Sequence, residues 1–414
     1  MCWGIVMTYP EYIKKCIDLL EKNGFSAYVV GGAVRDGLLG KEAHDWDVTT
    51  SARPEQIMDT FADFRTIPTG IKHGTVTVLV DAEGSAPVPV EITTFRIDGE
   101  YLDNRRPSEV IFTPSVTDDL SRRDFTVNAM AYNEKEGLVD LFGSKEDLER
   151  GIIRCVGDPK TRYSEDALRI LRAYRFAAQL GFEIEKKTLA DAASCVHLLK
   201  NIARERIGVE LIKLLAGEGV EYALDKMTES GAFDVILGFS PDERAIKRAS
   251  AINSADALAR LSMLILELDE EKKGDVLSSL RLSNEQKRYV LRICKAAELE
   301  TDADVDTLSV VARRFLANYA NICDVALEAL FASGKNQAHT LEKFAEAVRG
   351  EREKEICLSI SELALDGKDV LAIAREPAQV GAILSALLEY VIEHPEKNEK
   401  KLLLKVAKEL ADNM

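Results

Sequence analysis

Residues 25–36 have the sequence FSAYVVGGAVRD, and HDWDVT follows at residues 44–49. The apolar run Phe25–Val30 is typical of a strand, and the glycine pair after it predicts a tight turn into a helix. In DWDVT the apolar side chains alternate with two aspartates, as they do in a half-buried strand. The stretch therefore predicts a sheet that presents Asp45 and Asp47 on one face.

The turn after the first predicted strand can bind phosphate. Gly31 and Gly32 would let the backbone come close to a phosphate group, and the following helix start offers free N–H donors. Arg35 could then donate two hydrogen bonds to a triphosphate. A plain glycine turn with no ligand explains these residues equally simply.

Two carboxylates held side by side repel each other unless a cation lies between them, and hard oxygen ligands suit magnesium. Asp45 and Asp47 are therefore candidate catalytic metal ligands, although a DxD sequence is also common in surface turns. Glu91, on a later predicted strand, is either a third catalytic carboxylate or a solvent-facing strand residue.

The remaining first third of the chain mixes strands and helices. Two further runs with β-branched residues at alternating positions predict strands, and the segment between them, residues 81–87, predicts a hairpin loop. The predicted strands are Gly74–Val80 and Val88–Phe95, and the predicted helices are Pro10–Asn23 and Arg53–Phe64. From about Ser144 onward, helical apolar spacing prevails. The fold class is therefore α+β, a small mixed sheet with helices followed by an all-α remainder.

Length and composition limit the class of protein. The chain has 414 residues, of which 46% are hydrophobic and 30% charged, so we expect two to four soluble domains. We find no run of about 18 apolar residues and no signal-peptide pattern at the start, so we expect no membrane span. Seven scattered cysteines with no CxxC pair are typical of the reducing cytoplasm.

The net charge of −16 disfavours a nucleic-acid partner as a general tendency. A phosphate backbone, however, meets a local basic patch and not the average surface. Five basic residues in the second half of the chain would form either such a patch or an ordinary solvated helix face: Arg281, Lys287, Arg288, Arg292 and Lys295.

A second charged cluster, DDLSRRDFTVNA, occupies residues 118–129. One interpretation is a capped helix with surface ion pairs, which are common and weak. The other places Arg123 on the phosphates or sugar of a nucleotide, with Arg122 and Asp124 arranging it.

The segment EDALRILRAYRFAA, residues 165–178, predicts an apolar helix with charges at every third position. Those charges, at Asp166, Arg169, Arg172 and Arg175, would form a stripe along about half of the helix. The dense apolar neighbours favour a stripe that faces a cleft over a ladder of solvated salt bridges.

Asp166 and Arg169 could read a base. An ionised Asp only accepts hydrogen bonds and an Arg only donates them. Cytosine and adenine both present an amino donor beside a ring-nitrogen acceptor, whereas guanine and uracil present the reverse order. Such a pair suits C and A and rejects G and U, so the protein itself could serve as the template.

These motifs, in this order, resemble the class II tRNA nucleotidyltransferases, the CCA-adding enzymes, and their relatives the bacterial poly(A) polymerases. The resemblance covers roughly residues 25–215, through GGAVRD, DWD, RRDFTVNAMA, LVDLFG, RYSEDALRILRAYRFAAQLGF and RERIGVELIKLL. It implies a nucleotidyltransferase head at residues 1–147, a helical neck with the base-reading helix at 148–215, a helical body at 216–297 and a tRNA-binding tail at 298–414.

The resemblance also implies roles for individual residues. Gly32 and Arg35 would hold the triphosphate, Asp45 and Asp47 would bind Mg²⁺, and Arg123 would contact the incoming nucleotide. Asp166, Arg169, Arg172 and Arg175 would read the base and support the site. RIDGEYLDNRRP, residues 96–107, resembles the flexible loop of the members that add all three nucleotides.

We therefore expect a cytoplasmic enzyme that adds C, C and A to the tRNA 3′ end from CTP and ATP, with no membrane or protein partner implied. The alternatives are an A-adding enzyme, a poly(A) polymerase and an RNA-binding module with an inactive head. The only His-Asp dipeptide is His44-Asp45, and no HD motif follows in the helical half, so we expect no accessory hydrolase activity.

Overall fold

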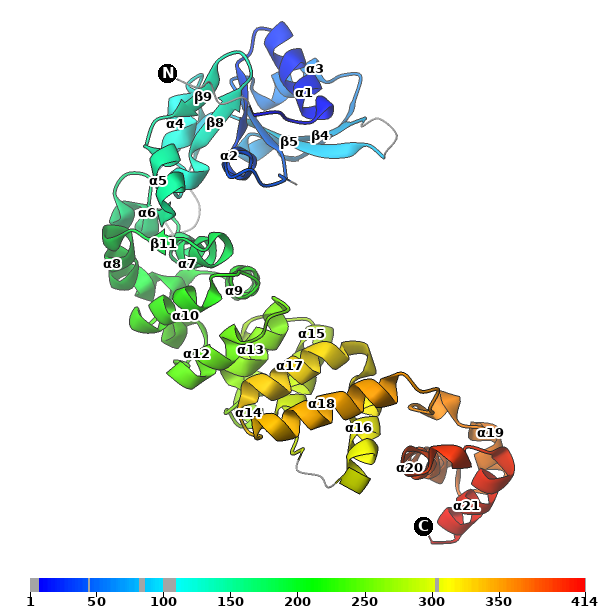
Figure 1. Ribbon diagram of the computed structural model, residues 1–414. Helices are drawn as coiled ribbons and strands as arrows, with labels where there is room; N and C mark the ends of the chain where they lie inside the picture. Colours follow the sequence, from blue (N-terminus) through cyan, green and yellow to red (C-terminus); the bar gives the residue numbers. More distant parts are fainter. Residues whose placement is uncertain (1–6, 44, 82–85, 100–108, 302–304, 414) are drawn as a thin grey trace. The chain divides into compact units, whose positions relative to one another are not determined.

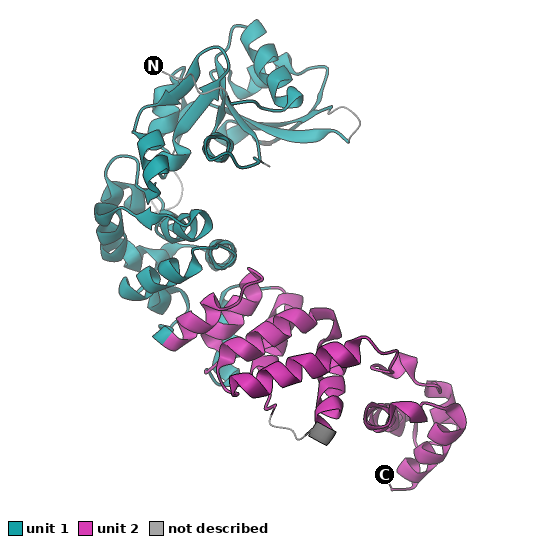
Figure 2. Ribbon diagram, in the orientation of Figure 1, with its two compact units in different colours: residues 1–243, 268–282 teal, residues 244–267, 283–414 magenta. Residues whose placement is uncertain are grey.

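The computed structural model describes residues 7–43, 45–81, 86–99, 109–301 and 305–413 (Figure 1). By its internal contacts the chain separates into two units, which Figure 2 distinguishes by colour. Unit 1 comprises residues 1–243 and 268–282, and unit 2 comprises residues 244–267 and 283–414.

Unit 1 begins with a mixed β-sheet and its covering helices. The elements are α1 (Glu11–Lys22), β1 (Ala27–Val30), α2 (Gly32–Leu38), β2 (Asp47–Thr50), α3 (Pro54–Thr60), β3 (Arg65–Gly70), β4 (Thr75–Val80), β5 (Val88–Thr94), β6 (Arg96–Asp98), β7 (Val110–Phe112), α4 (Val116–Ser121), β8 (Met130–Asn133) and β9 (Gly137–Asp140). Two short 3₁₀ turns, η1 (Ile71–His73) and η2 (Thr126–Asn128), lie among them.

The rest of unit 1 is largely helical. Its elements are α5 (Ser144–Arg150), β10 (Ile152–Ile153), α6 (Pro159–Glu165), α7 (Leu168–Leu180), β11 (Glu183–Ile184), α8 (Lys186–Cys195), η3 (Val196–Asn201), α9 (Arg204–Leu215), α10 (Val220–Glu229), α11 (Ala232–Ile236) and α14 (Glu270–Ser279). The predicted change to helical structure near Ser144 is confirmed.

The sheet has the strand order β3-β4-β5-β2-β1-β8-β9. All neighbouring strands are antiparallel except β2 and β5, so the sheet is mixed, as predicted. In β4 alternate residues are buried, and its three valines each contribute about 1.5–3 kcal/mol by burial. β4 and β5 form the predicted antiparallel hairpin, although residues 82–85 of its loop lie outside the described residues.

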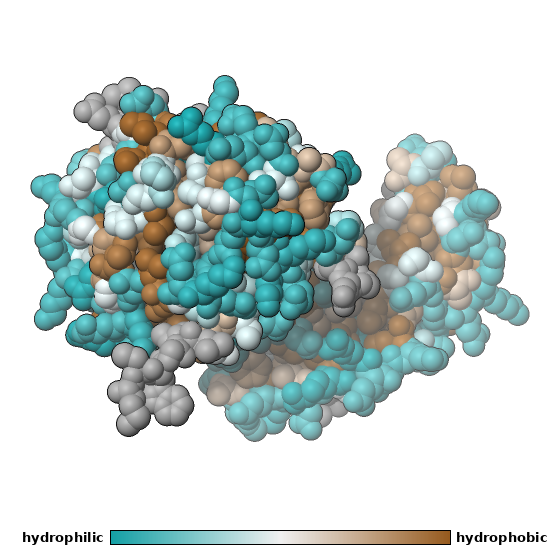
Figure 3. Space-filling model, turned by 90° about the horizontal axis from the view of Figure 1, so that it is seen from above, coloured by the Kyte–Doolittle hydropathy of each residue, from teal (hydrophilic) through white to brown (hydrophobic). Residues whose placement is uncertain are grey.

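Every residue of β1 is buried, which fits a central strand with both faces covered. One face packs in a cluster where Tyr28 and Val30 meet Phe95, Leu120 and Ala131. Two of the sheet's strands, β8 and β9, follow the charged cluster of residues 118–129, and the sequence did not predict them. On the face in Figure 3, hydrophilic residues cover most of the near part of the molecule, and apolar residues form strips between them.

Unit 2 is helical throughout its described part. Its elements are α12 (Glu243–Ser250), α13 (Ala257–Ile265), α15 (Asn284–Ala297), α16 (Val305–Tyr319), η4 (Ala320–Ile322), α17 (Cys323–Ser333), α18 (Ala338–Arg352), η5 (Ile360–Glu362), α19 (Gly367–Leu371), η6 (Pro377–Gln379), α20 (Val380–Glu393), η7 (Pro395–Lys397) and α21 (Lys400–Asn413). The α+β fold class with an all-α remainder is confirmed.

By length and composition alone, one segment, Thr307–Ser333, is long and apolar enough to cross a membrane. In the structure it is two α-helices, α16 and α17, joined by a 3₁₀ turn. Arg313 of α16 is buried and forms an ion pair with Glu351 at 3.2 Å, while Phe315 packs edge-on against Phe344. These contacts are those of a helix in a protein core.

Candidate active site

The glycine turn lies where β1 meets α2. Gly31 has φ +74° and ψ −128°, a conformation that only glycine adopts readily. A Cβ atom at this position would come within 3.2 Å of Nη1 of Arg123. Gly32 then begins α2, and the guanidinium of Arg35 lies beside it. The turn thus leaves room for an arginine from a different segment of the head.

Arg35 is fixed by polar contacts on two sides. Its Nε and Nη2 donate to the carboxylate of Asp36 at 2.8 and 3.0 Å, and its Nη1 donates to Oδ1 of Asn128 at 2.7 Å. Its guanidinium also lies 5.8 Å from the ring centre of Phe176. Arg35 is therefore held in one orientation before any ligand is present.

The predicted strand at residues 45–49 is correct in place but begins two residues later than expected. β2 starts at Asp47, so exposed Asp45 precedes the strand. In the parallel pair β2–β5, Val48 lies opposite Ile92, which brings Asp47 beside Glu91 on the other face.

These three acids interact. Burial, followed by the charges of Asp45 and Glu91, raises the pKa of Asp47 to about 6, and the nearby charge of Arg123 only partly opposes this. Carboxylates that destabilise one another in this way are suited to a bound cation.

Among the described residues no group of three or more His, Cys, Asp or Glu side chains is arranged to hold a metal ion. Magnesium in phosphoryl-transfer sites is commonly held by one or two carboxylates together with substrate phosphates and water. Asp47, at the start of the central strand β2, and Asp45, just before it, fit that kind of incomplete site and do not form a closed protein cage.

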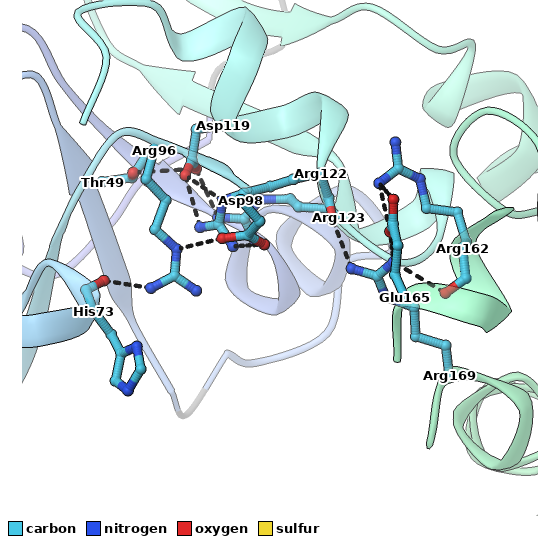
Figure 4. Close-up of polar contacts among 10 residues, drawn as sticks. All are labelled: Thr49, His73, Arg96, Asp98, Asp119, Arg122, Arg123, Arg162, Glu165 and Arg169. Carbon is cyan, nitrogen blue, oxygen red and sulfur yellow. Dashed lines mark hydrogen bonds and ion pairs between the residues drawn. The ribbon is translucent and has the colours of Figure 1, made fainter. Parts of the chain in front are cut away.

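The cluster of residues 118–129 is more than a set of surface ion pairs. Asp119 is fully buried, and Arg122 and Arg123 both bind it, at 2.7 and 3.3 Å (Figure 4). Burial alone would raise the pKa of Asp119, but the charges and hydrogen bonds of the two arginines outweigh it and lower the pKa. Thr49 of β2 donates to the same carboxylate at 3.3 Å, which joins this cluster to the strand that carries Asp47.

The segment predicted as one helix, residues 165–178, is two helices. α6 ends at Glu165, and Asp166 has extended backbone angles before α7 begins at Leu168. The carboxylate of Asp166 accepts from the backbone N–H of Leu168 at 3.1 Å. An aspartate that binds the backbone locally competes with helix continuation, which explains why the prediction of a single charged helical stripe was wrong.

Asp166 and Arg169 have different ion-pair partners. Asp166 accepts from Nη2 of Arg206 at 2.9 Å. Arg169 is buried and binds Glu165 at 2.5 Å and the carbonyl oxygen of Arg122 at 2.9 Å (Figure 4). Both side chains are therefore held by α6, α9 and the head.

The last two charges of the predicted stripe form a network with Glu210 of α9. Arg172 donates twice to Oδ2 of Asp124, at 2.8 and 2.5 Å, and lies 3.8 Å from Glu210. Arg175 lies 3.0 Å from Glu210 and 4.0 Å above the ring of Phe176. Burial, and then the charge of Arg172, lowers the pKa of Arg175 to about 10.

A cavity of about 570 Å³ lies among these segments. It brings together four of the predicted residues, Arg123, Asp166, Arg169 and Arg172. The complete lining is Arg122, Arg123, Asp124, Asp166, Leu168, Arg169, Arg172, Glu205, Arg206, Val209 and Glu210. The other predicted site residues, Gly32, Arg35, Asp45, Asp47, Glu91 and Arg175, are not part of this lining.

Four lining residues of α9 were not assigned a role from the sequence: Glu205, Arg206, Val209 and Glu210. Val209 is 54% exposed and, together with Leu168, gives a largely charged cavity an apolar surface. The spacing of Arg206 and Glu210, one helical turn apart in an apolar helix, was the available signal.

Three family models match the chain in sequence. They are "Poly A polymerase head domain" at residues 27–154, "Probable RNA and SrmB-binding site of polymerase A" at residues 181–242, and a tRNA nucleotidyltransferase domain 2 at residues 251–407.

Full-length relatives agree with these matches. The chain is 34% identical to the CCA-adding enzyme of Ligilactobacillus salivarius and 37% identical to that of Leuconostoc citreum, in each case over 99% of both chains. Among solved structures it is similar to the Bacillus stearothermophilus CCA-adding enzyme in complex with CTP. That structure shares 30% identity and a TM-score of 0.81, covering 97% of this chain and 98% of the other.

Proposed function

We propose that this chain, which belongs to the family of CCA-adding enzymes and is a nucleotidyltransferase, adds C, C and A to the 3′ end of tRNA from CTP and ATP and releases pyrophosphate. The Bacillus stearothermophilus relative was solved with CTP, which supports a pyrimidine nucleotide as one substrate. The template-independent addition of two different bases requires a protein surface that accepts C and A and rejects G and U.

The observation that carries this proposal is the cavity in which Asp166 and Arg169 both lie. An acceptor and a donor there match the amino group and ring nitrogen that C and A share. Leu168 and Val209 add apolar surface on which a base can pack. Arg172 forms an ion pair with Asp124, and Arg175 forms one with Glu210. These two arginines would support the base-reading residues Asp166 and Arg169.

The transfer step is assigned to the carboxylates of the head. Asp45 and Asp47 would hold two Mg²⁺ ions, and Glu91 would be the third catalytic carboxylate. When bound, the ions supply charge stabilisation at the α-phosphate and lower the pKa of the RNA 3′-hydroxyl for in-line attack. The close approach of like charges at Asp47 supports a cation there.

The triphosphate is assigned to the glycine turn and its arginines. Gly32 allows close approach of the backbone, Arg35 offers an oriented guanidinium, and Arg123 lies beside Gly31. Arg123 neighbours both this turn and the base cavity, so it can contact the nucleotide between its phosphates and its base.

The division into head, neck, body and tail, at residues 1–147, 148–215, 216–297 and 298–414, and the cytoplasmic location are further parts of the proposal. The tail would bind tRNA. Of the five basic residues considered for such binding, Arg281 belongs to unit 1, and Lys287, Arg288, Arg292 and Lys295 lie on α15 of unit 2. The loop implied at residues 96–107 lies mostly outside the described residues, which stop at residue 99 and resume at 109.

The test is to incubate the protein with a tRNA that lacks its CCA end, with CTP and ATP, and to resolve the products by length. We expect three additions followed by a stop. A long ladder of added A would instead identify a poly(A) polymerase, and extension only of tRNA that already ends in CC would identify an A-adding enzyme. If the protein releases pyrophosphate from neither CTP nor ATP, the head is inactive.

A further inference from the structure

A continuous line of hydrogen bonds joins the glycine turn to the base cavity, and one buried amide lies at its centre. Asn128, in η2, is 7% exposed. Its Oδ1 accepts from Nη1 of Arg35 at 2.7 Å, and its Nδ2 donates to Oδ1 of Asp124 at 3.4 Å. Oδ2 of Asp124 in turn accepts from Arg172, which lines the cavity.

The chemistry of this line needs an amide at position 128. One neighbour, Arg35, only donates, and the other, Asp124, only accepts. An amide has one acceptor and one donor group, so it satisfies both neighbours at once. A carboxylate would face that of Asp124, and an aliphatic side chain would leave Arg35 and the buried Asp124 without this partner.

Asn128 also determines how Arg35 presents its remaining donors. Among the described residues, Asp36 takes two of its five N–H groups and Asn128 takes one. One N–H on each terminal nitrogen is then available to an anion. Removing Asn128 would release Nη1 and allow the guanidinium to turn about its contact with Asp36.

We propose that Asn128 is a positioning residue for nucleotide binding, which fixes Arg35 for the triphosphate and connects it through Asp124 to the base cavity. The proposal rests on the role proposed for Arg35. Because the triphosphate is common to both nucleotides, Asn128 should affect the binding of CTP and ATP equally and leave base selection unchanged.

The experiment is a double-mutant cycle with Asn128→Ala, Arg35→Ala and the double variant, measured by steady-state incorporation into tRNA. We expect Asn128→Ala to raise the KM for CTP and for ATP by about tenfold, as the loss of one charge-assisted hydrogen bond predicts. The KM for tRNA and the discrimination against UTP should not change. In the Arg35→Ala background, Asn128→Ala should raise the nucleotide KM by less than about twofold.

Asn133→Ala is the matched control. Asn133 is also a buried amide of the head, 1% exposed, and its Nδ2 donates to Glu21 and Ala27 at 2.7 and 2.8 Å. It should lower the melting temperature by a similar amount without changing the nucleotide KM. If Asn128→Ala does not fold, Asn128→Ser keeps a polar atom in the site but is too short to span both neighbours, and should show the same KM increase.

The outcomes distinguish the inference about Asn128 from the proposed role of Arg35. An unchanged nucleotide KM in both Asn128 variants overturns the inference. So does a tenfold effect of Asn128→Ala that persists in the Arg35→Ala background, because Asn128 would then not act through Arg35. If Arg35→Ala itself leaves the nucleotide KM unchanged, the proposed role of Arg35 fails first and the inference fails with it.

Discussion

The head contains two acidic sites that differ in their partners. The first is Asp47 with its neighbours Asp45 and Glu91, and the second is Asp124 with its arginine partner. Burial and two like charges raise the pKa of Asp47 to about 6, with Arg123 as the opposing charge. Asp124 is more deeply buried, yet Arg172 holds its pKa at about 2. Burial raises the pKa in both places, so the surrounding charges decide the outcome. The first site has uncompensated negative charge that would suit an added cation, whereas the second is already neutralised by its arginine partner.

The largest effect should come from the first site. Asp47→Asn should reduce nucleotide incorporation by at least about a thousandfold, because bound metal ions supply several kcal/mol to the transition state. It should leave the melting temperature unchanged or higher, since it removes repulsion from Asp45 and Glu91. Pyrophosphate release and thermal unfolding measure the two effects. The exposed Asp59→Asn is the control, and a variant within tenfold of wild type at saturating Mg²⁺ would disprove the metal assignment.

The second site should behave in the opposite way. Asp124→Ala leaves Arg172 without its main partner, and breaking a buried pair costs about 3–5 kcal/mol of unfolding free energy. Arg352→Ala, which breaks the exposed pair with Asp324, should cost less than about 1 kcal/mol. Urea unfolding compares the two variants. Equal losses would show that the Asp124–Arg172 pair is no more important than a surface contact.

Base selection should be a smaller effect that leaves the fold intact. Asp166→Ala removes the acceptor that disfavours a carbonyl, so discrimination against UTP and GTP should fall by roughly tenfold to a hundredfold, the worth of one charged hydrogen bond. Competition between labelled nucleotides on the same tRNA gives the ratio directly. If the variant loses activity equally with all four nucleotides, Asp166 supports the helix junction or Arg206 and does not read the base.

In the metal-free enzyme, Asp124 and Asp47 should change the unfolding free energy with pH in opposite directions. Asp124, with a lowered pKa, stabilises the fold above its unfolded pKa of about 4, and this is lost as the pH falls toward about 2. Asp47, whose pKa is raised, stabilises the fold below a pH of about 4, and this stabilisation is lost as the pH rises through about 6. Each contribution is on the order of 2 kcal/mol. Asp124→Asn and Asp47→Asn should flatten the unfolding free energy in their respective windows, and a flat wild-type profile from pH 2 to 6 would contradict both.

Local patterns predicted much of the head. Three elements were predictable because residues close together in the sequence determine them: the alternating valines of β4, the apolar run of β1 and the amphipathic α1. Their positions are confirmed within a few residues. The break at Asp166 was missed because its cause is a single side chain that accepts from the backbone N–H of Leu168, inside a stretch whose composition favours helix. Strands β8 and β9 were missed because the charged residues before them dominated the interpretation.

In the candidate site, too, local features could be predicted from the sequence and contacts between distant residues could not. The residues proposed to bind metal and phosphate could be identified from their types and spacing, but their contact partners could not. Arg206 reaches Asp166 from 40 residues away, and Asn128 reaches Arg35 from 93 residues away. Such pairs depend on which elements the fold brings together, and a single sequence contains no local signal for them.

Gly31 is a position at which evolution of this protein should accept almost no substitution. Its backbone occupies a region that other residues rarely adopt, and a Cβ there would press against Nη1 of Arg123 at 3.2 Å. Two independent requirements therefore coincide at one position, so relieving either alone does not admit a substitution. If all twenty residues were supplied at position 31 and active clones were selected, glycine should be recovered almost alone. This part of the site is encoded by the absence of a side chain.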